Sequence, residues 1–243
     1  MCTVTYIPKG QDHFILTSNR DENYSRAAEH PEILILENQH RLFPKDPKSG
    51  GSWIAVSAKN RVACLLNGAF EKHRHRPPYK RSRGLVLLDF FGYTKIDDFV
   101  KNYDFHDIEP FTMIMYEGLY LVEFRWDGHE KHLTPLKLDQ AYIWSSTTLY
   151  DLKTREMRSS WFHQWLKVNK QPGMEDLMHF HRYGGEPDQS NGFVMNRGNQ
   201  VQTLSITGIE KYHQSAVMHH LDLLKDQEVR KRIDLENETV ESN

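Results

Sequence analysis

Short apolar stretches alternate with turn-forming residues along the first third of the chain. Residues 2–7 (CTVTYI) and 13–18 (HFILTS) are rich in β-branched and aromatic side chains, and the connection PKGQD between them favours a turn. A second pair of such stretches, 52–57 (SWIAVS) and 61–66 (RVACLL), flanks the short connection AKN. The pattern predicts two consecutive β-hairpins.

The apolar period changes from that of a strand to that of a helix after the second hairpin. Residues 82–103 carry apolar positions at helical spacing and predict one or two amphipathic helices broken near Gly92. Residues 111–117, 118–126 and 130–136 return to the period of a strand and predict an antiparallel meander.

The second half of the chain repeats this change of period. Residues 141–146 predict a strand, and residues 149–168 and 173–183 predict helices. The remaining apolar stretches predict closing strands at 191–196, 200–212 and 215–224.

The predicted elements come in blocks of strands, helices, strands, helices and strands. This order is not βαβ alternation, so it favours an α+β fold with mainly antiparallel sheets and helices on the outer faces. Residues 229–243 are rich in charge and are expected to form a tail that frays at its end. No repeat, linker or low-complexity tract divides the chain, which predicts a single domain over residues 1–243.

The charge balance narrows the class of partner. The 243 residues include 31 basic and 33 acidic side chains, which give a formal net charge of −2. A nearly neutral chain argues against binding to nucleic acid through bulk charge. Two cysteines provide no disulfide framework, no secretory leader is visible, and the apolar runs are too short to span a bilayer. These observations favour a cytoplasmic protein without a membrane span.

The position of Cys2 suggests a nucleophile. Removal of Met1 would leave Cys2 with both a thiol and a free α-amine, whose reference pKa is about 7.7–8.0. A nucleophile with its own general base is one known solution to acyl transfer. The first hairpin ends its second strand at Arg20 and Asp21, beside the start of the chain. The sequence therefore predicts a cation and a carboxylate near this thiol, although a cysteine at this position is usually incidental.

Three segments together resemble the NRDE family, which is the family of transport and Golgi organisation protein 2 and its bacterial relatives. These segments are MC at the start, NRDENYSRAAEHP at 19–31 and GGSWIAVSAKNRVACLLN at 50–67. The match covers roughly the first third of the chain. The family is similar to N-terminal-nucleophile hydrolases, and among these to acylases of the penicillin V acylase and bile-salt hydrolase kind.

The resemblance implies a fold and a set of catalytic roles. The implied fold is a four-layer αββα sandwich of two mainly antiparallel sheets. Cys2 would be the nucleophile and Asp21 the partner of its α-amine. Arg20 would lie beside them, and Asn67 would donate to the oxyanion. No cofactor is implied.

The resemblance also singles out residues outside this catalytic set. Asn19, from the segment Asn-Arg-Asp-Glu, and Trp53, from the segment Gly-Gly-Ser-Trp, are expected to bind substrate. Where relatives carry Asn and Arg, this chain has Ser146 and Leu204, so two groups that assist catalysis in relatives are replaced. These departures weaken the prediction that an amide is hydrolysed.

A basic segment between Lys72 and Arg83 allows two interpretations. Such a run is most often a solvated loop. Alternatively, it forms the mouth for an anionic substrate that Arg74, Arg76 and Lys80 would bind.

Three closely spaced pairs of histidines and the second cysteine are further candidate sites. His73 and His75, His179 and His181, and His219 and His220 are spaced closely, but no pattern of cysteine or carboxylate completes a zinc set, so no metal is expected. Cys64 lies in the middle of a predicted strand and is expected to be inert core.

Two hypotheses of function remain open from the sequence. The first is a hydrolase or acyltransferase that acts on the C–N bond of a linear amide, with an anionic or acyl-bearing small molecule as substrate. The alternative is a non-catalytic binding or trafficking protein that uses the same cleft for an apolar, lipid-like or haem-like ligand.

Overall fold

The computed structural model describes residues 3–185, 190–198 and 200–236, and its strands form two sheets. Sheet A contains, in spatial order, β10 (Tyr142–Ser145), β1 (Thr3–Gly10), β2 (His13–Glu22), β12 (Val201–Tyr212), β13 (Ser215–Asp222) and β14 (Gln227–Asp234), and β11 (Asn196–Arg197) pairs with β12. Sheet B contains β3 (Glu32–Leu36), β4 (Gln39–Phe43), β5 (Ile54–Ser57), β6 (Arg61–Asn67), β7 (Phe111–Glu117), β8 (Tyr120–Trp126) and β9 (Lys131–Leu136). All strand pairs formed by the described residues are antiparallel.

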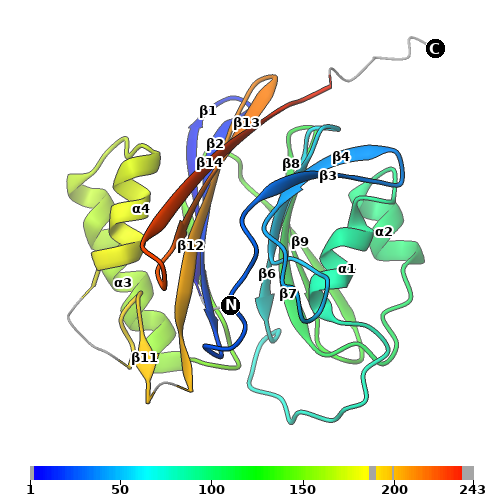
Figure 1. Ribbon diagram of the computed structural model, residues 1–243, viewed down its shortest axis with the longest axis horizontal. Helices are drawn as coiled ribbons and strands as arrows, with labels where there is room; N and C mark the ends of the chain where they lie inside the picture. The colour runs from blue at the N-terminus through cyan, green and yellow to red at the C-terminus, as the bar shows by residue number, and fades with distance from the viewer. Residues whose placement is uncertain (1–2, 186–189, 199, 237–243) are drawn as a thin grey trace.

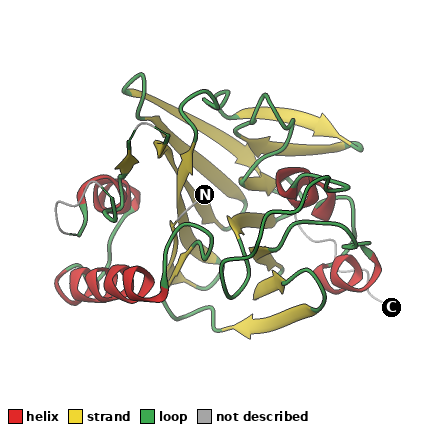
Figure 2. Cartoon of the chain, turned by 90° about the horizontal axis from the view of Figure 1, so that it is seen from below, coloured by secondary structure: helices red, strands yellow, loops and turns green. Residues whose placement is uncertain are grey.

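The helices form two outer layers around the stacked sheets. They are α1 (Arg83–Phe90), α2 (Ile96–Asn102), α3 (Leu152–Val168) and α4 (Met174–Tyr183). Figure 1 shows α3 and α4 against the outer face of sheet A, and α1 and α2 against the outer face of sheet B. The view from below places the same two helix pairs on opposite flanks of the strands (Figure 2). The predicted αββα sandwich is confirmed.

Side-chain alternation along β1 and β2 divides the core into two parts. Tyr6, Phe14 and Leu16 belong to the cluster of buried residues that includes the strands of sheet B. Ile7 and Ile15 belong to the cluster that includes α3 and α4. Successive side chains of a strand face opposite sides. Residues 17–22 of β2 are therefore expected to alternate between the side of sheet B and the side of α3 and α4.

Most elements expected from the sequence are present. The two hairpins are β1–β2 and β5–β6, the helical stretch of 82–103 is split into α1 and α2, and the meander is β7–β8–β9. The sequence pattern missed the hairpin β3–β4, whose turn residues Glu37 and Asn38 both have positive φ, 51° and 60°. This backbone conformation fits a two-residue hairpin turn, but the residue pair Glu-Asn lacks the glycine that usually signals one.

The strand predicted at 191–196 is wrong except for Asn196, which belongs to β11. The carbonyls of Asn191 and Gly192 accept hydrogen bonds from the Arg158 guanidinium, at 3.0 and 2.5 Å. A side chain from α3 therefore bonds the carbonyls that a neighbouring strand would bond, and Phe193 and Met195 are buried without forming a ladder.

The expected charged tail is also partly wrong, because β14 pairs with β13 along its whole length. Ile233 is buried and Val229 is half-buried, whereas most of the charged residues between them are exposed. Charged side chains are common on edge strands, where they discourage pairing with another chain. Residues 237–243 lie outside the described residues.

None of the described helices is long and apolar enough to cross a membrane.

Candidate functional site

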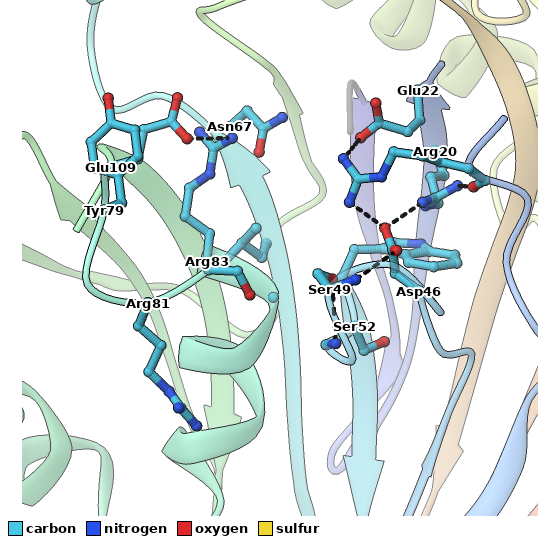
Figure 3. A pocket seen from close by; sticks show the side chains of 16 residues that line it. Arg20, Glu22, Asp46, Ser49, Ser52, Asn67, Tyr79, Arg81, Arg83 and Glu109 are labelled. Atoms are coloured by element: carbon cyan, nitrogen blue, oxygen red, sulfur yellow. Dashed lines mark hydrogen bonds and ion pairs between the residues drawn. The ribbon is translucent and has the colours of Figure 1, made fainter. Parts of the chain in front are cut away.

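A pocket of about 380 Å³ lies between the two sheets, near the ends of β2 and β6. Segments 46–53 and 79–84 close it from the side of sheet B. Figure 3 shows its charged side chains gathered on two opposing walls. The lining residues are Arg20, Glu22, Arg26, Asp46, Ser49, Gly51, Ser52, Trp53, Leu65, Asn67, Tyr79, Arg81, Ser82, Arg83, Gly84 and Glu109.

Asp46 is the centre of the first wall. Its carboxylate accepts from Arg20 at 2.7 Å and from Arg26 at 2.5 Å, and the backbone N–H groups of Lys48 and Ser49 donate to its other oxygen at 3.0 and 3.2 Å. Burial opposes ionisation of Asp46, but the two arginines and the N–H groups outweigh it and hold the pKa of this carboxyl below its usual range. Asp46 is therefore a fixed anion that orients two cations.

Arg20 is held in the pocket wall by three contacts. Besides its bond to Asp46, its guanidinium donates to the carbonyl of Arg26 at 2.6 Å and lies 4.8 Å from the ring centroid of Trp53. Burial lowers the pKa of Arg20, and Asp46 offsets part of this effect. A buried guanidinium with both hydrogen-bond and ring contacts has little freedom to move.

Glu109 and Arg83 form the second wall, with a separation of 3.0 Å (Figure 3). His73 and His75 also contact Glu109, at 3.0 and 3.2 Å. Burial opposes ionisation of Glu109, but Arg83 and the two histidines outweigh it, so the pKa of this carboxyl is lowered. Both walls of the pocket therefore contain a carboxylate that forms an ion pair with an arginine.

Asn67 is the last residue of β6 and its side chain lines the pocket. Its backbone carbonyl accepts a hydrogen bond from the Ser146 hydroxyl at 2.9 Å, and the same hydroxyl contacts Thr148 at 2.9 Å. Ser146, one of the departures from the family pattern, therefore ties the end of β6 to the segment after β10. Leu204, the other departure, is buried within β12.

Asp21 points away from the pocket lining, toward the helix layer. Its carboxylate accepts from the Tyr150 hydroxyl at 2.9 Å and from the Thr203 hydroxyl at 2.5 Å. A bulge in β12 between Thr203 and Ser205 lies opposite Asp21 and Arg20. Arg20 and Asp21 are thus neighbours in sequence on opposite faces of β2, as strand alternation requires.

Asn19 shares the helix-facing side of β2. Its amide donates to the carbonyls of His181 and Phe193 at 3.0 and 2.8 Å, and its carbonyl oxygen contacts the His181 ring. Burial lowers the pKa of His181 to about 3, so this ring is neutral. The expected role of Asn19 in substrate binding is not supported by this geometry, because its side chain ties β2 to α4.

The start of β1 is fixed by Arg158 from α3. The Arg158 guanidinium donates to the Thr3 hydroxyl at 2.5 Å, and its Cζ atom lies 3.7 Å from the ring centroid of Tyr150. Thr3 pairs with Asn19 on one side and with Ser145 on the other. Cys2 lies outside the described residues, so its expected convergence with Asp21 and Asn67 stays a prediction.

The basic segment is divided between two pockets. Arg74 and Arg76 line a neighbouring pocket of about 820 Å³, and Tyr79 lines both. Lys80 is exposed and pairs with Asp104 at 2.5 Å. Trp53, in contrast, lines the pocket between the sheets.

Six charged residues of the pocket lining were not predicted as site residues from the sequence. Two of them, Asp46 and Glu109, lie in connections without a periodic pattern, and the other four lie within the family motif or the basic segment: Glu22, Arg26, Arg81 and Arg83. Buried arginines need anionic partners, so the sequence could have indicated that acidic residues lie near these arginines. It does not indicate which acidic residue pairs with which arginine.

Close approach of two backbones shapes the wall beside Ser52. The N–H of Ser52 donates to the carbonyl of Gly84 at 3.1 Å. A Cβ at Gly51 would lie 2.4 Å from the Gly84 carbonyl carbon and 2.6 Å from the backbone nitrogen of Leu85. Only glycine lets the start of α1 pack this closely against the connection that leads into β5.

Gly51→Ala is therefore expected to destabilise the protein by about 1–3 kcal/mol, because the backbone contacts cannot relax by a side-chain rotation. Urea denaturation followed by circular dichroism measures the loss. Gly92→Ala is the matched control, since its Cβ would meet the movable carboxylate of Glu37 at 2.7 Å. Equal losses in the two variants would contradict the role of the close backbone approach.

The two antiparallel sheets between two helix layers define a fold similar to that of N-terminal-nucleophile hydrolases. The chain itself belongs to the Transport and Golgi organisation 2 family, whose model matches residues 1–231. No curated protein sequence matches the chain.

Solved structures with this fold are distant in sequence. A Caenorhabditis elegans ortholog of N-acylethanolamine-hydrolyzing acid amidase has a TM-score of 0.59 and 13% identity, over 86% of this chain and 92% of that chain. The C2A mutant of conjugated bile acid hydrolase from Clostridium perfringens has a TM-score of 0.56 and 10% identity, over 99% of this chain and 100% of that chain. At such low identity these likenesses show the fold alone.

Proposed function

We propose that this protein hydrolyses the C–N bond of a linear amide, with Cys2 as nucleophile after Met1 is removed. The observation that carries the proposal is the register of β1 and β2. Thr3 pairs with Asn19, so the start of β1 lies beside the segment that holds Arg20 and Asp21. The Arg20 face of this segment lines the same pocket as Asn67.

The side-chain directions agree with such a site. The Thr3 side chain contacts Arg158 in the helix layer, and Arg20 faces the pocket on the other side of the sheet. Cys2 can act in the pocket only if its thiol faces the side opposite Thr3, which is the relation that strand alternation gives to neighbouring residues.

The proposed reaction begins with transfer of the thiol proton to the α-amine of Cys2. The thiolate sulfur then attacks the carbonyl carbon of the amide, and the electron pair of the C=O bond moves onto oxygen. The side-chain N–H of Asn67 donates to this oxyanion. As the C–N bond breaks, the α-ammonium returns its proton to the leaving amine, and water then hydrolyses the thioester and restores the thiol.

Arg20 and Asp21 have different roles in this mechanism. Arg20 is a cation held in place by Asp46 and Trp53, and it favours the thiolate electrostatically. Asp21 orients the α-amine, while Tyr150 and Thr203 keep its carboxylate in position from the helix side.

The charged lining favours a polar substrate over an apolar ligand. Two anchored pairs, Arg20 with Asp46 and Arg83 with Glu109, face the same pocket. A purely apolar ligand would have to desolvate these charges without providing hydrogen bonds in return. The lining therefore argues against a purely apolar occupant of this pocket and favours a ligand with its own polar groups.

Acylation of Cys2 by an activated acyl ester tests the proposal. We expect one acyl group on the peptide that contains Cys2, followed by its loss to water. Cys64 is the internal control, because it is fully buried and burial raises the pKa of its thiol to about 12. Intact and peptide mass spectrometry measures both events. Unchanged ester turnover by Cys2→Ala would contradict the proposal.

A further inference from the structure

Three potential metal ligands gather on the outer face of sheet A, away from the pocket. They are Glu175 in the first turn of α4, His219 in β13 and Glu228 in β14. His219 Nδ1 lies 3.7 Å from Glu228 Oε1 and 4.0 Å from Glu175 Oε1. The donor atoms of all three residues lie within 4.8 Å of one another.

His219 points into this cluster without a hydrogen-bond partner. The residue is only 7% exposed, and its Nδ1 atom is buried with no partner among the described residues. Buried ring nitrogens are normally paired, because an unsatisfied polar atom loses its hydration without compensation. Burial, with a further contribution from Arg230, lowers the pKa of His219. The ring is therefore neutral near pH 7, which is the form that binds metals.

The two carboxylates are bridged by a movable cation. Arg230 Nε contacts Glu228 Oε1 at 2.6 Å, and its Nη2 contacts Glu175 Oε1 at 2.7 Å. All three side chains are substantially exposed, and ion pairs of this kind contribute little to stability. Arg230 thus compensates one of the two carboxylate charges and leaves the His219 Nδ1 atom without a hydrogen bond.

We propose that Glu175, His219 and Glu228 bind one divalent transition-metal ion of the zinc type, which displaces Arg230. Zinc–ligand bonds of about 2.0–2.2 Å give a tetrahedron whose donor atoms are roughly 3.3–3.5 Å apart. The glutamate oxygens lie 3.7 and 4.0 Å from His219 Nδ1 and within 4.8 Å of each other, so side-chain rotations that close these distances by up to about 1.5 Å reach this spacing. Water would complete the coordination.

The donor set selects among metals. One imidazole nitrogen and two carboxylate oxygens suit Zn²⁺, whereas Mg²⁺ and Ca²⁺ prefer oxygen ligands alone. A bound ion would link the start of α4 to the β13–β14 hairpin, in addition to the ion pairs of Arg230 with Glu175 and of Arg182 with Asp226 that already join them. Binding to the folded state alone would also raise the melting temperature.

Calorimetric titration of the full chain with ZnCl₂ tests the site, with melting temperature as the second readout. We expect one zinc ion per chain at this site and no heat with MgCl₂. Glu175→Gln and Glu228→Gln should weaken its binding by about tenfold or more. Arg230→Ala should tighten it roughly two- to fivefold, because the competing cation is gone.

Glu156→Gln on α3 is the control, since Glu156 is an exposed glutamate of the same helix layer outside the cluster. His219→Ala should abolish binding, and the two glutamine variants keep the test valid if that variant fails to fold. Absence of zinc binding by the unaltered chain, or equal binding by the glutamine variants, would overturn the proposal. Unchanged affinity in Arg230→Ala would overturn the displacement of Arg230.

Discussion

Protein that retains Met1 is expected to hydrolyse an amide substrate about 10²–10⁴-fold more slowly than protein that begins at Cys2, which is the range that general-base assistance supplies. Retention of Met1 turns the α-amine of Cys2 into an amide nitrogen, which cannot accept the thiol proton. Turnover of one amide substrate by the two forms, each verified by intact mass, measures the difference.

Two substitutions of the nucleophile are the controls for this comparison. Cys2→Ala should be inactive in the processed form, and Cys2→Ser should retain a trace because a hydroxyl is a weaker nucleophile with a higher pKa. Equal turnover by the processed and Met1-retaining chains would remove the α-amine from the mechanism and restore the binding-protein hypothesis.

Asn67→Ala is expected to lower kcat by about 10²–10³-fold with a small change in KM, because an oxyanion donor acts mainly in the transition state. The expectation rests on the position of Asn67 at the end of β6, where its side chain lines the pocket. Steady-state kinetics on the same amide substrate measures kcat and KM separately.

The control for Asn67 is Tyr79→Phe, which alters a different lining residue of the pocket without a proposed contact to the reacting carbonyl. Its kcat should stay within a few-fold of the unaltered enzyme. Melting temperatures of both variants exclude unfolding as the cause. A rise in KM with an unchanged kcat in Asn67→Ala would instead assign this residue to substrate binding.

The sequence predicted the layers of the fold because their elements have strong periodic patterns. The β1–β2 hairpin and the helices on either side follow from apolar spacing, and the expected inert core position of Cys64 is confirmed by its burial. β14 was missed because its apolar alternation is hidden among charges, and 191–195 was misassigned because Arg158 replaces a partner strand. Both errors come from contacts distant in the chain.

Only the part of the candidate site that the family motifs contribute could be predicted from the sequence. Arg20, Asp21 and Asn67 were expected near one cleft; Arg20 and Asn67 line the pocket, whereas the Asp21 carboxylate faces the helix side of β2. Asp46 and Glu109, which hold the arginines of the two walls, come from connections that no local pattern marks. Long-range charge pairing depends on which loops meet in space, and the spacing of residues in one chain does not encode that directly.

The side chains of Arg20 and Asp21 face opposite sides of β2, so the order of these two residues determines which layer each of them contacts. Exchange of these two residues would leave length, net charge and hydropathy unchanged. It would nevertheless bring a third carboxylate beside Glu22 and Asp46, and bury a guanidinium against the hydroxyls of Tyr150 and Thr203. A comparison of composition alone would rate such a chain as identical, although the side chains on the pocket side and on the helix side of β2 would both lose their partners.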